Sequence, residues 1–283
     1  MLQPKNTRTS TSLIPHIPTM DDDSVEALRN NKKSRLSTLK KHLSTDVDES
    51  WADLVLLVTC FISGLVDSAV FNVWSCFVSM QTGNTVYVGL GMSGQPLSQP
   101  YRWVKSGTAI LSFSVGTYFF SRAARYLGPL RRRTMSGSFI FQALLCFTAA
   151  LLVVSDVVES DAGNQLPRNF IVLLPLGLLS FQSAGQIVMS RMLAYNELPT
   201  VVLTSTYCDL MFDPALFTAP LRQNSKRNRR FLSAVALLLG AVLGGFLTKG
   251  GDIADPLWIA GAIKVVLAVV WLFWHGKGSI RLE

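Results

Sequence analysis

The chain is 283 residues long, with 49% hydrophobic and only 16% charged residues. A water-soluble domain of this size usually carries about a quarter charged residues, so this composition excludes an ordinary soluble globular protein. The net charge of +8 does not indicate a nucleic-acid partner, because the basic residues lie at the ends of apolar segments and form no nucleic-acid-binding motif.

Residues 1–50 are rich in Ser, Thr, Pro and charge, and contain no apolar segment that could bury surface. We therefore predict a disordered basic tail. Its Lys and Arg residues are suited to contact the anionic lipid of a cytoplasmic membrane face. The alternative to contact with lipid is that the tail is a solvated linker. The basic cluster consists of Arg29, Lys32, Lys33, Arg35, Lys40 and Lys41.

From residue 51 onward apolar segments dominate, and six have close to the ~20 residues that a helix needs to cross a bilayer. They lie near 53–74, 103–122, 134–155, 170–190, 231–249 and 257–274. Two further apolar segments, 76–92 and 198–212, are shorter and are interrupted by polar, Gly or Pro residues. The predicted fold class is an all-α integral membrane protein with about six transmembrane helices, and the lipid bilayer is its expected partner.

The positions of Lys and Arg distinguish six spans from eight, because these residues are retained on the cytoplasmic side. With six spans and a cytoplasmic tail, the basic segments 122–133 and 222–230 both lie inside, as does the C-terminus. If the two short segments also spanned, the arginines of 122–133 would move outside. We therefore predict re-entrant or interfacial short segments and cytoplasmic termini, in a plasma or an internal membrane.

Each half of this arrangement has a span, a short segment and two more spans. We predict a first transmembrane half at 51–160 and a second at 161–283, which ends in a short C-terminal tail. Three spans per half make the second half inverted relative to the first. Many secondary transporters are built as inverted repeats, with sites where interrupted segments meet. Chance similarity between two apolar halves is the alternative interpretation.

Polar residues near the first short segment are candidates for a binding site. Asp67 lies in the first span, where a carboxylate is costly unless it faces a partner or water. It is interpreted as a proton or cation site, or as a structural hydrogen bond between helices. Thr82, Gly83 and Asn84 either line a water-filled cavity or form a helix end with Asn84 as its cap.

Three further residues complete the predicted solute or ion site. Lys264 lies midway along the last span and is interpreted as the counter-charge of Asp67, or as a side chain that extends to the interface. Gln182 and Gln186 are one helical turn apart and line a polar path, or form hydrogen bonds between helices. Gly240 and Gly244 favour close helix packing.

The residues that an enzyme or a metal site needs are sparse. Each of the four cysteines is isolated in an apolar or motif segment, and the three histidines lie in the tail or at the chain end. Neither set matches metal-ligand spacing. Asp209 and Asp213 could pair on one helical face, but a metal-dependent transferase needs a larger acidic cluster. We expect no catalytic activity, no metal and no cofactor.

The segment 64–84, GLVDSAVFNVWSCFVSMQTGN, resembles the distinctive motif of the YoaK family of bacterial and fungal membrane proteins, a domain of unknown function. The matching residues are Gly64, Asp67, Thr82, Gly83 and Asn84. The second-half segment Thr204-Ser205-Thr206 is similar to the family's Thr-Gly-Thr element, with Ser205 in place of Gly. The likeness covers about 51–275, and the tail suggests a fungal-type member. It implies a multi-span membrane fold and no particular activity.

The intramembrane charges and the interrupted segments together predict a transporter or channel for a small solute. A membrane scaffold or sensor that uses the tail for docking is the first alternative, and a membrane-embedded enzyme is the second. The sequence specifies neither the solute nor an oligomeric state.

Overall fold

The computed structural model describes residues 22–99, 101–158 and 170–278. These described residues form nine α-helices and only isolated β-bridges, so the predicted all-α fold is confirmed. The chain divides into two compact units, residues 1–42 and residues 43–283. The second unit is the helical bundle.

The first unit differs from the predicted disordered tail. Helix α1 (Asp22–Ser44) occupies most of its described part, so the prediction of disorder is wrong for those residues. The segment contains neither Gly nor Pro and is rich in Leu, Lys and Arg, which are good helix formers. Low hydropathy therefore indicated, correctly, a segment without a core but did not exclude a helix. Residues 1–21 lie outside the described residues.

The boundary between tail and bundle lies earlier than predicted, because residues 43–50 belong to the bundle. The Val47 N–H donates to the Leu130 carbonyl at 2.8 Å, and the Tyr195 hydroxyl donates to the Glu49 carbonyl at 2.8 Å. The predicted boundary between the two transmembrane halves, at 160–161, lies outside the described residues.

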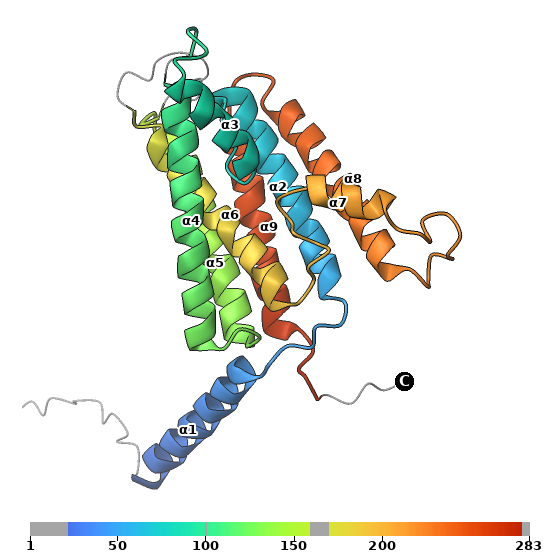
Figure 1. The fold of residues 1–283 in the computed structure, drawn as a ribbon. Coiled ribbons are helices and arrows are strands. Elements are labelled where there is room, and N and C mark those ends of the chain that lie inside the picture. Colours follow the sequence, from blue (N-terminus) through green and yellow to red (C-terminus); the bar gives the residue numbers. More distant parts are fainter. Residues whose placement is uncertain (1–21, 100, 159–169, 279–283) are drawn as a thin grey trace, which may run out of the picture. The chain divides into compact units, whose positions relative to one another are not determined.

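Five described helices are long and apolar enough to cross a bilayer. They are α2 (Ala52–Trp74), α5 (Arg132–Val154), α6 (Leu173–Met192), α8 (Ser225–Leu247) and α9 (Ala254–Phe273). Helix α4 (Arg102–Leu127) has 26 residues and runs beside them in Figure 1. Ser or Thr occupies five positions between 106 and 117, which lowers its hydropathy. The prediction of about six membrane-crossing helices agrees with this bundle.

The two short segments form helices that cannot cross the membrane. Helix α3 (Gln81–Met92) has 12 residues and α7 (Thr204–Met211) has eight. At 1.5 Å per residue they extend about 18 and 12 Å, against a hydrocarbon core of about 30 Å. The prediction that neither short segment spans is therefore confirmed.

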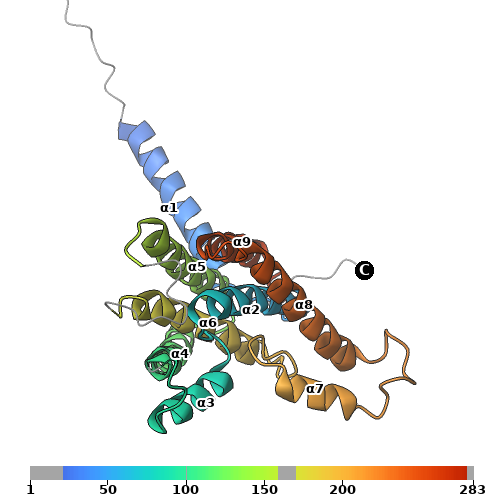
Figure 2. The ribbon, with the colours of Figure 1, turned by 90° about the horizontal axis from the view of Figure 1, so that it is seen from above.

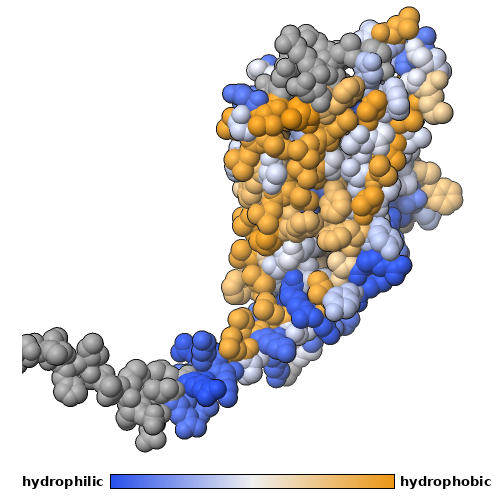
Figure 3. Space-filling model, turned by 90° about the vertical axis from the view of Figure 1, so that its left-hand side faces the viewer, coloured by the Kyte–Doolittle hydropathy of each residue, from blue (hydrophilic) through white to orange (hydrophobic). Residues whose placement is uncertain are grey.

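The outer surface of the bundle is apolar. Figure 3 shows hydrophobic side chains over the middle of one face and hydrophilic ones at its lower end. Large aliphatic side chains on four helices are more than half exposed, which a water-soluble monomer rarely tolerates over a contiguous area. They include Leu111, Leu144, Leu151, Leu238 and Val266. The protein is therefore a multi-pass integral membrane protein.

The bundle has pseudo-two-fold packing, which Figure 2 shows from above. Helix α2 packs against α8 as α6 packs against α4, and α3 packs against α4 as α7 packs against α8. Helices α5 and α9 pack against each other. Exchanging α2 with α6, α4 with α8, α5 with α9 and α3 with α7 therefore maps the first four pairs onto one another and the pair of α5 and α9 onto itself.

This exchange also reverses the direction of every helix. Helices α2, α5 and α8 begin at the end of the bundle where α4, α6 and α9 finish (Figure 1). We name this the basic end, because the arginines of 122–133 and 222–230 lie next to the helix ends there. The Asp48 N–H, just before α2, donates to the His275 carbonyl just after α9. Arg229, near the start of α8, contacts Asp53 in the first turn of α2. The two halves thus form the predicted 3+3 inverted arrangement.

Small residues allow the paired helices to cross closely. A Cβ on Gly240 of α8 would overlap the Phe61 carbonyl of α2, and a Cβ on Gly116 of α4 would overlap the Phe181 carbonyl of α6. Phe61-Ile62-Ser63-Gly64 and Phe181-Gln182-Ser183-Ala184 share a Phe-x-Ser-small pattern at these crossings. This correspondence favours a true repeat over chance similarity.

We predict that Gly240→Ala lowers the thermal unfolding midpoint of the protein in detergent, because the new Cβ would force the backbones of α2 and α8 apart. Overpacking of this kind costs about 1–3 kcal/mol. Gly245→Ala is the matched control, since a Cβ there meets nothing within 4 Å. Its midpoint should equal or exceed that of wild type, because Ala favours helix over Gly. Equal midpoints for the two variants would contradict the close crossing.

Candidate functional site

The connection between α2 and α3 is an irregular segment inside the protein. Cys76 and Val78 are fully buried, and Ser79 is nearly so. Backbone N–H groups away from water need acceptors, and irregular backbone at membrane depth needs protein or water around it. Asp67 meets this need: its Oδ1 accepts from the N–H groups of Val78 at 2.8 Å and Ser79 at 3.0 Å. Its Oδ2 accepts from the Ser79 hydroxyl.

Asn84 holds the same connection from the α3 side. Its Oδ1 accepts from the Phe77 N–H at 3.3 Å, and its Nδ2 donates to the Phe77 carbonyl at 2.7 Å. The Ser106 hydroxyl of α4 also donates to Asn84 Oδ1, at 3.3 Å. A Cβ on Gly83 would lie 3.0 Å from the Phe77 ring, and Thr82 is exposed. Asp67 and Asn84 thus hold one loop between them.

The second half holds its corresponding connection differently. The Ser190 hydroxyl of α6 donates to the carbonyls of Tyr195 and Leu198, at 2.9 and 2.5 Å, in the segment that leads to α7. A hydroxyl here binds loop carbonyls, whereas Asp67 binds loop N–H groups. Ser190 was not among the predicted site residues, since one serine in an apolar span is common.

A second polar cluster surrounds Lys264 at the middle of α9. The Lys264 side chain is fully buried, and its Nζ donates to Gln142 Oε1 of α5 at 2.8 Å and to Gln186 Oε1 of α6 at 3.0 Å. Gln186 Nε2 then donates to the Thr59 carbonyl and to Ser63 Oγ of α2, at 2.9 and 3.2 Å. We name Lys264, Gln142, Gln186 and Ser63 the amine cluster.

The predicted ion pair between Lys264 and Asp67 is wrong. Lys264 faces the two glutamines of α5 and α6, whereas both oxygens of Asp67 face the connection that follows α2. The two sites are instead linked through α6. The Ser183 hydroxyl donates to the Val78 carbonyl at 3.1 Å, one turn from Gln186. Gln182 is buried beside them, and its Oε1 has no hydrogen-bond partner among the described residues.

The amine cluster lies where the two halves of the bundle meet. Lys264 comes from α9 and Gln142 from α5, two helices that the pseudo-two-fold exchanges, and the two side chains contact each other directly. A lysine has three N–H donors, and amide oxygens rather than carboxylates accept two of them here. The ion pairs of the described residues involve other side chains, near the ends of the helices. The cluster can therefore attract an anion, or exchange a proton.

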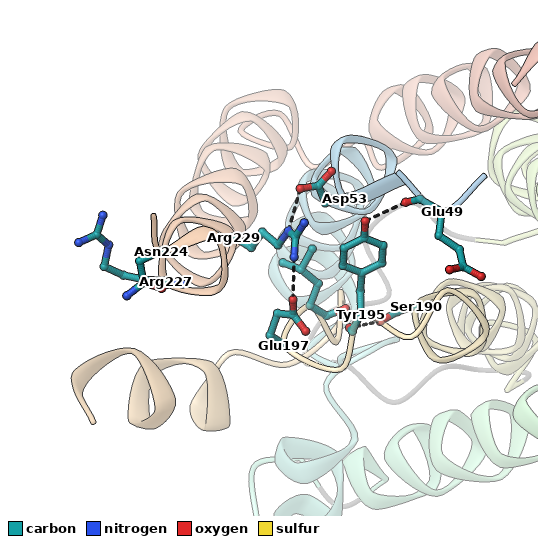
Figure 4. A network of polar contacts seen from close by, with 9 residues as sticks. Glu49, Asp53, Ser190, Tyr195, Glu197, Asn224, Arg227 and Arg229 are labelled. Carbon is teal, nitrogen blue, oxygen red and sulfur yellow. Dashed lines mark hydrogen bonds and ion pairs between the residues drawn. The ribbon is translucent and has the colours of Figure 1, made fainter. Parts of the chain in front are cut away.

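A separate network ties the halves together at the basic end (Figure 4). Arg229 of α8 contacts Asp53 of α2 at 2.8 Å and Glu197, after α6, at 3.1 Å. Its guanidinium lies 4.6 Å from the centre of the Tyr195 ring. Burial raises the pKa of the Tyr195 hydroxyl, and the neighbouring Asp53 charge adds to this effect. Such partly exposed ion pairs contribute about 1 kcal/mol or less each.

The acidic pair suggested in the second half does not form. Asp209 contacts Arg230 at 3.5 Å, whereas Asp213 accepts from Asn224 Nδ2 at 2.9 Å. The hydrogen bond from Asn224 lowers the pKa of the Asp213 carboxyl. Over the described ranges, no three His, Cys, Asp or Glu side chains come close enough to hold a metal ion.

Comparison with protein families matched residues 55–270 to a family described as protein of unknown function (DUF1275). The match extends from within α2 to within α9 and includes the Asp67 and Asn84 motif residues. It agrees with the resemblance to the YoaK family. No curated protein and no solved structure matched the chain.

Proposed function

The chain belongs to the DUF1275 family of membrane proteins, and on that premise we propose that it carries a small solute across the bilayer, past the amine cluster. The observation that supports this proposal is the fully buried Lys264 amine, which amide oxygens hold between the two halves of the bundle. Burying a charged group in a membrane costs several kcal/mol, so intramembrane lysines are rare outside functional sites.

The inverted packing supports the same function. In inverted-repeat transporters the substrate site lies near the midplane, at the interface between the repeats, and one half moves against the other to expose it to each side in turn. In this proposal the amine cluster occupies the corresponding place. We propose that Lys264, Gln142, Gln186 and Gln182 contact the solute, whereas Asp67, Gly83 and Asn84 position the connection beside it. The basic end faces the cytoplasm in this proposal, because arginines concentrate there.

A liposome swelling assay tests this function. Liposomes that contain the full chain are placed in iso-osmotic solutions of amino acids, sugars, monocarboxylates or inorganic anions, and light scattering reports solute entry. We expect at least one class of solute to enter faster than into protein-free liposomes. If none does, the proposal of transport is wrong.

The same assay separates transport from the scaffold or sensor alternative. A chain without residues 1–42 keeps the bonds that Val47 and Glu49 make to the bundle. A transporter should keep its solute entry without these residues. Entry that requires the tail would favour a regulated sensor. The absence of enzyme activity stays a prediction.

A further inference from the structure

A pocket of about 250 Å³ lies between α4, α5 and α6, toward the basic end. Its wall is mainly apolar and includes Phe119, Phe120, Phe141, Val188 and Met192. None of its lining residues is acidic. An apolar pocket of about 150 Å³ accommodates benzene, whereas drug-sized ligands occupy pockets of about 300–1,000 Å³. This pocket therefore fits one ring, or an aliphatic body of similar size, with one small polar group.

Three polar side chains from the first two turns of α5 line the pocket, those of Arg133, Thr134 and Ser138. Arg133 is exposed, and its one hydrogen-bond partner among the described residues is the Leu127 carbonyl, at 3.1 Å. The Thr134 hydroxyl is buried and has no partner within the described part of the chain. A guanidinium beside an unpaired hydroxyl donor is suited to a carboxylate.

The inner wall of the pocket separates it from the amine cluster. Ser138 lines the pocket, and its hydroxyl accepts from Gln142 Nε2 at 3.1 Å. Gln142 Oε1 accepts in turn from Lys264 Nζ. Gly185 allows this approach, since a Cβ there would lie 2.5 Å from Gln142 Nε2 and 3.0 Å from the Phe120 ring. One glutamine and one aromatic ring thus lie between the pocket and Lys264.

Three phenylalanines, Phe119, Phe120 and Phe141, form an aromatic wall of the pocket, and Phe181 packs against them. The rings of Phe119, Phe120, Phe141 and Phe181 contact one another with centroids 5.5–6.2 Å apart. Aromatic pairs in such tilted and edge-on arrangements are favourable and accept a further ring by the same geometry. The wall therefore favours a planar apolar body.

We propose that this pocket binds a compact organic monocarboxylate, with its ring on the phenylalanines and its carboxylate toward Arg133 and Thr134. The inference rests on the proposed function and names its solute class. The pocket is a binding site near the basic end, from which the acid reaches Lys264. Arg133 in the pocket lining and Lys264 beyond Gln142 favour an anion. The apolar lining favours an apolar ring or aliphatic group in the rest of the ligand.

Fluorine NMR of fluorobenzoate tests the inference, with the full chain in nanodiscs of zwitterionic lipid. Arg133→Gln should raise the Kd for fluorobenzoate about tenfold, because it removes a charge-assisted contact. Arg131→Gln is the matched control: Arg131 also donates to the Leu127 carbonyl, at 3.3 Å, but does not line the pocket. Neutral fluorobenzamide should bind more weakly than the acid and respond to neither variant. Equal effects of the two arginine variants, or equal binding of acid and amide, would overturn the inference.

A second variant tests the location of the ligand. Gly137 lines the pocket, and a Cβ there meets nothing within 4 Å, so Gly137→Leu should fill the pocket without disturbing the fold. It should abolish fluorobenzoate binding, whereas Gly245→Leu, also in open space, should not. Retained binding in Gly137→Leu would place the acid elsewhere. If fluorobenzoate binds as expected but benzoate does not enter the liposomes, the proposal of the pocket stands and the proposal of transport is wrong. If another solute enters the liposomes but fluorobenzoate does not bind, the proposal of transport stands and the proposal of the pocket is wrong.

Discussion

Asp67→Ala is expected to leave most of the protein unfolded. The substitution removes the acceptors of three buried donors, which are the N–H groups of Val78 and Ser79 and the Ser79 hydroxyl. Each buried donor without a partner costs about 1–3 kcal/mol, against a total stability of about 5–15 kcal/mol. The expected result is a large loss of monodisperse protein in size-exclusion chromatography and a much lower unfolding midpoint for any that remains.

Two further variants show whether Asp67 acts through this loop. Asp67→Asn keeps one acceptor oxygen and should lie between wild type and Asp67→Ala in its unfolding midpoint. Asp209→Ala removes a carboxylate whose side chain is 54% exposed, and should change the midpoint little. If Asp67 served only as an ion site, Asp67→Ala would fold with the wild-type midpoint and lose only solute entry.

The long helices of the bundle and their order were predictable, because a bilayer imposes its thickness on the sequence. A helix that crosses must be long and apolar, and both properties are visible without any tertiary information. The segments of α3 and α7 were shorter and interrupted, and the positions of Lys and Arg excluded them as spans. Helix α4 was identified as a span from its length despite its serines and threonines, and in the bundle it pairs with α6 as α8 pairs with α2.

Side-chain partners were not predictable, because they depend on which way each helix is turned. Asp67 and Lys264 are both intramembrane charges, and pairing them was the simplest hypothesis. The rotation of α2 and α9 directs them to different neighbours instead. Gln142 was missed because one glutamine in an apolar span usually forms an ordinary bond between helices. Its position in the repeat, opposite Lys264, was the signal that could have found it.

The basic end was predictable as a charged surface but not as a network. Arginines next to span ends are ordinary determinants of topology, so Arg229 attracted no special attention. Its contacts with Asp53 and Glu197 depend on the packing of α8 against α2, which needs Gly240 and Gly64 at the crossing. Charge placement alone carries no information on that packing.

Lys264→Met is expected to reduce entry of the admitted solute about tenfold or more, since each 1.4 kcal/mol of lost interaction is a factor of ten. Stability should change by about 2 kcal/mol or less. Replacing a buried ion by an apolar side chain is often neutral or favourable, although the oxygens of Gln142 and Gln186 lose their donor. Lys249→Met, at an exposed lysine outside the amine cluster, is the control and should keep wild-type entry. The swelling assay and the unfolding midpoint measure the two effects separately.

The inverted packing allows a stricter test of the same residue. Gln142 and Lys264 face each other from helices that the pseudo-two-fold exchanges, with Oε1 and Nζ 2.8 Å apart. The double variant Gln142→Lys, Lys264→Gln moves the amine to the other half and leaves it at the same interface. If solute entry needs an amine at this point, the double variant should recover a large part of the entry that Lys264→Gln loses. If Lys264 only supports the packing of α9, the exchange should restore nothing. Helix α9 packs closely on α5, where Gly261 lies against the Phe147 ring, and this packing is formed with the lysine on α9. Recovery would therefore assign the function to the buried amine itself rather than to the helix that carries it.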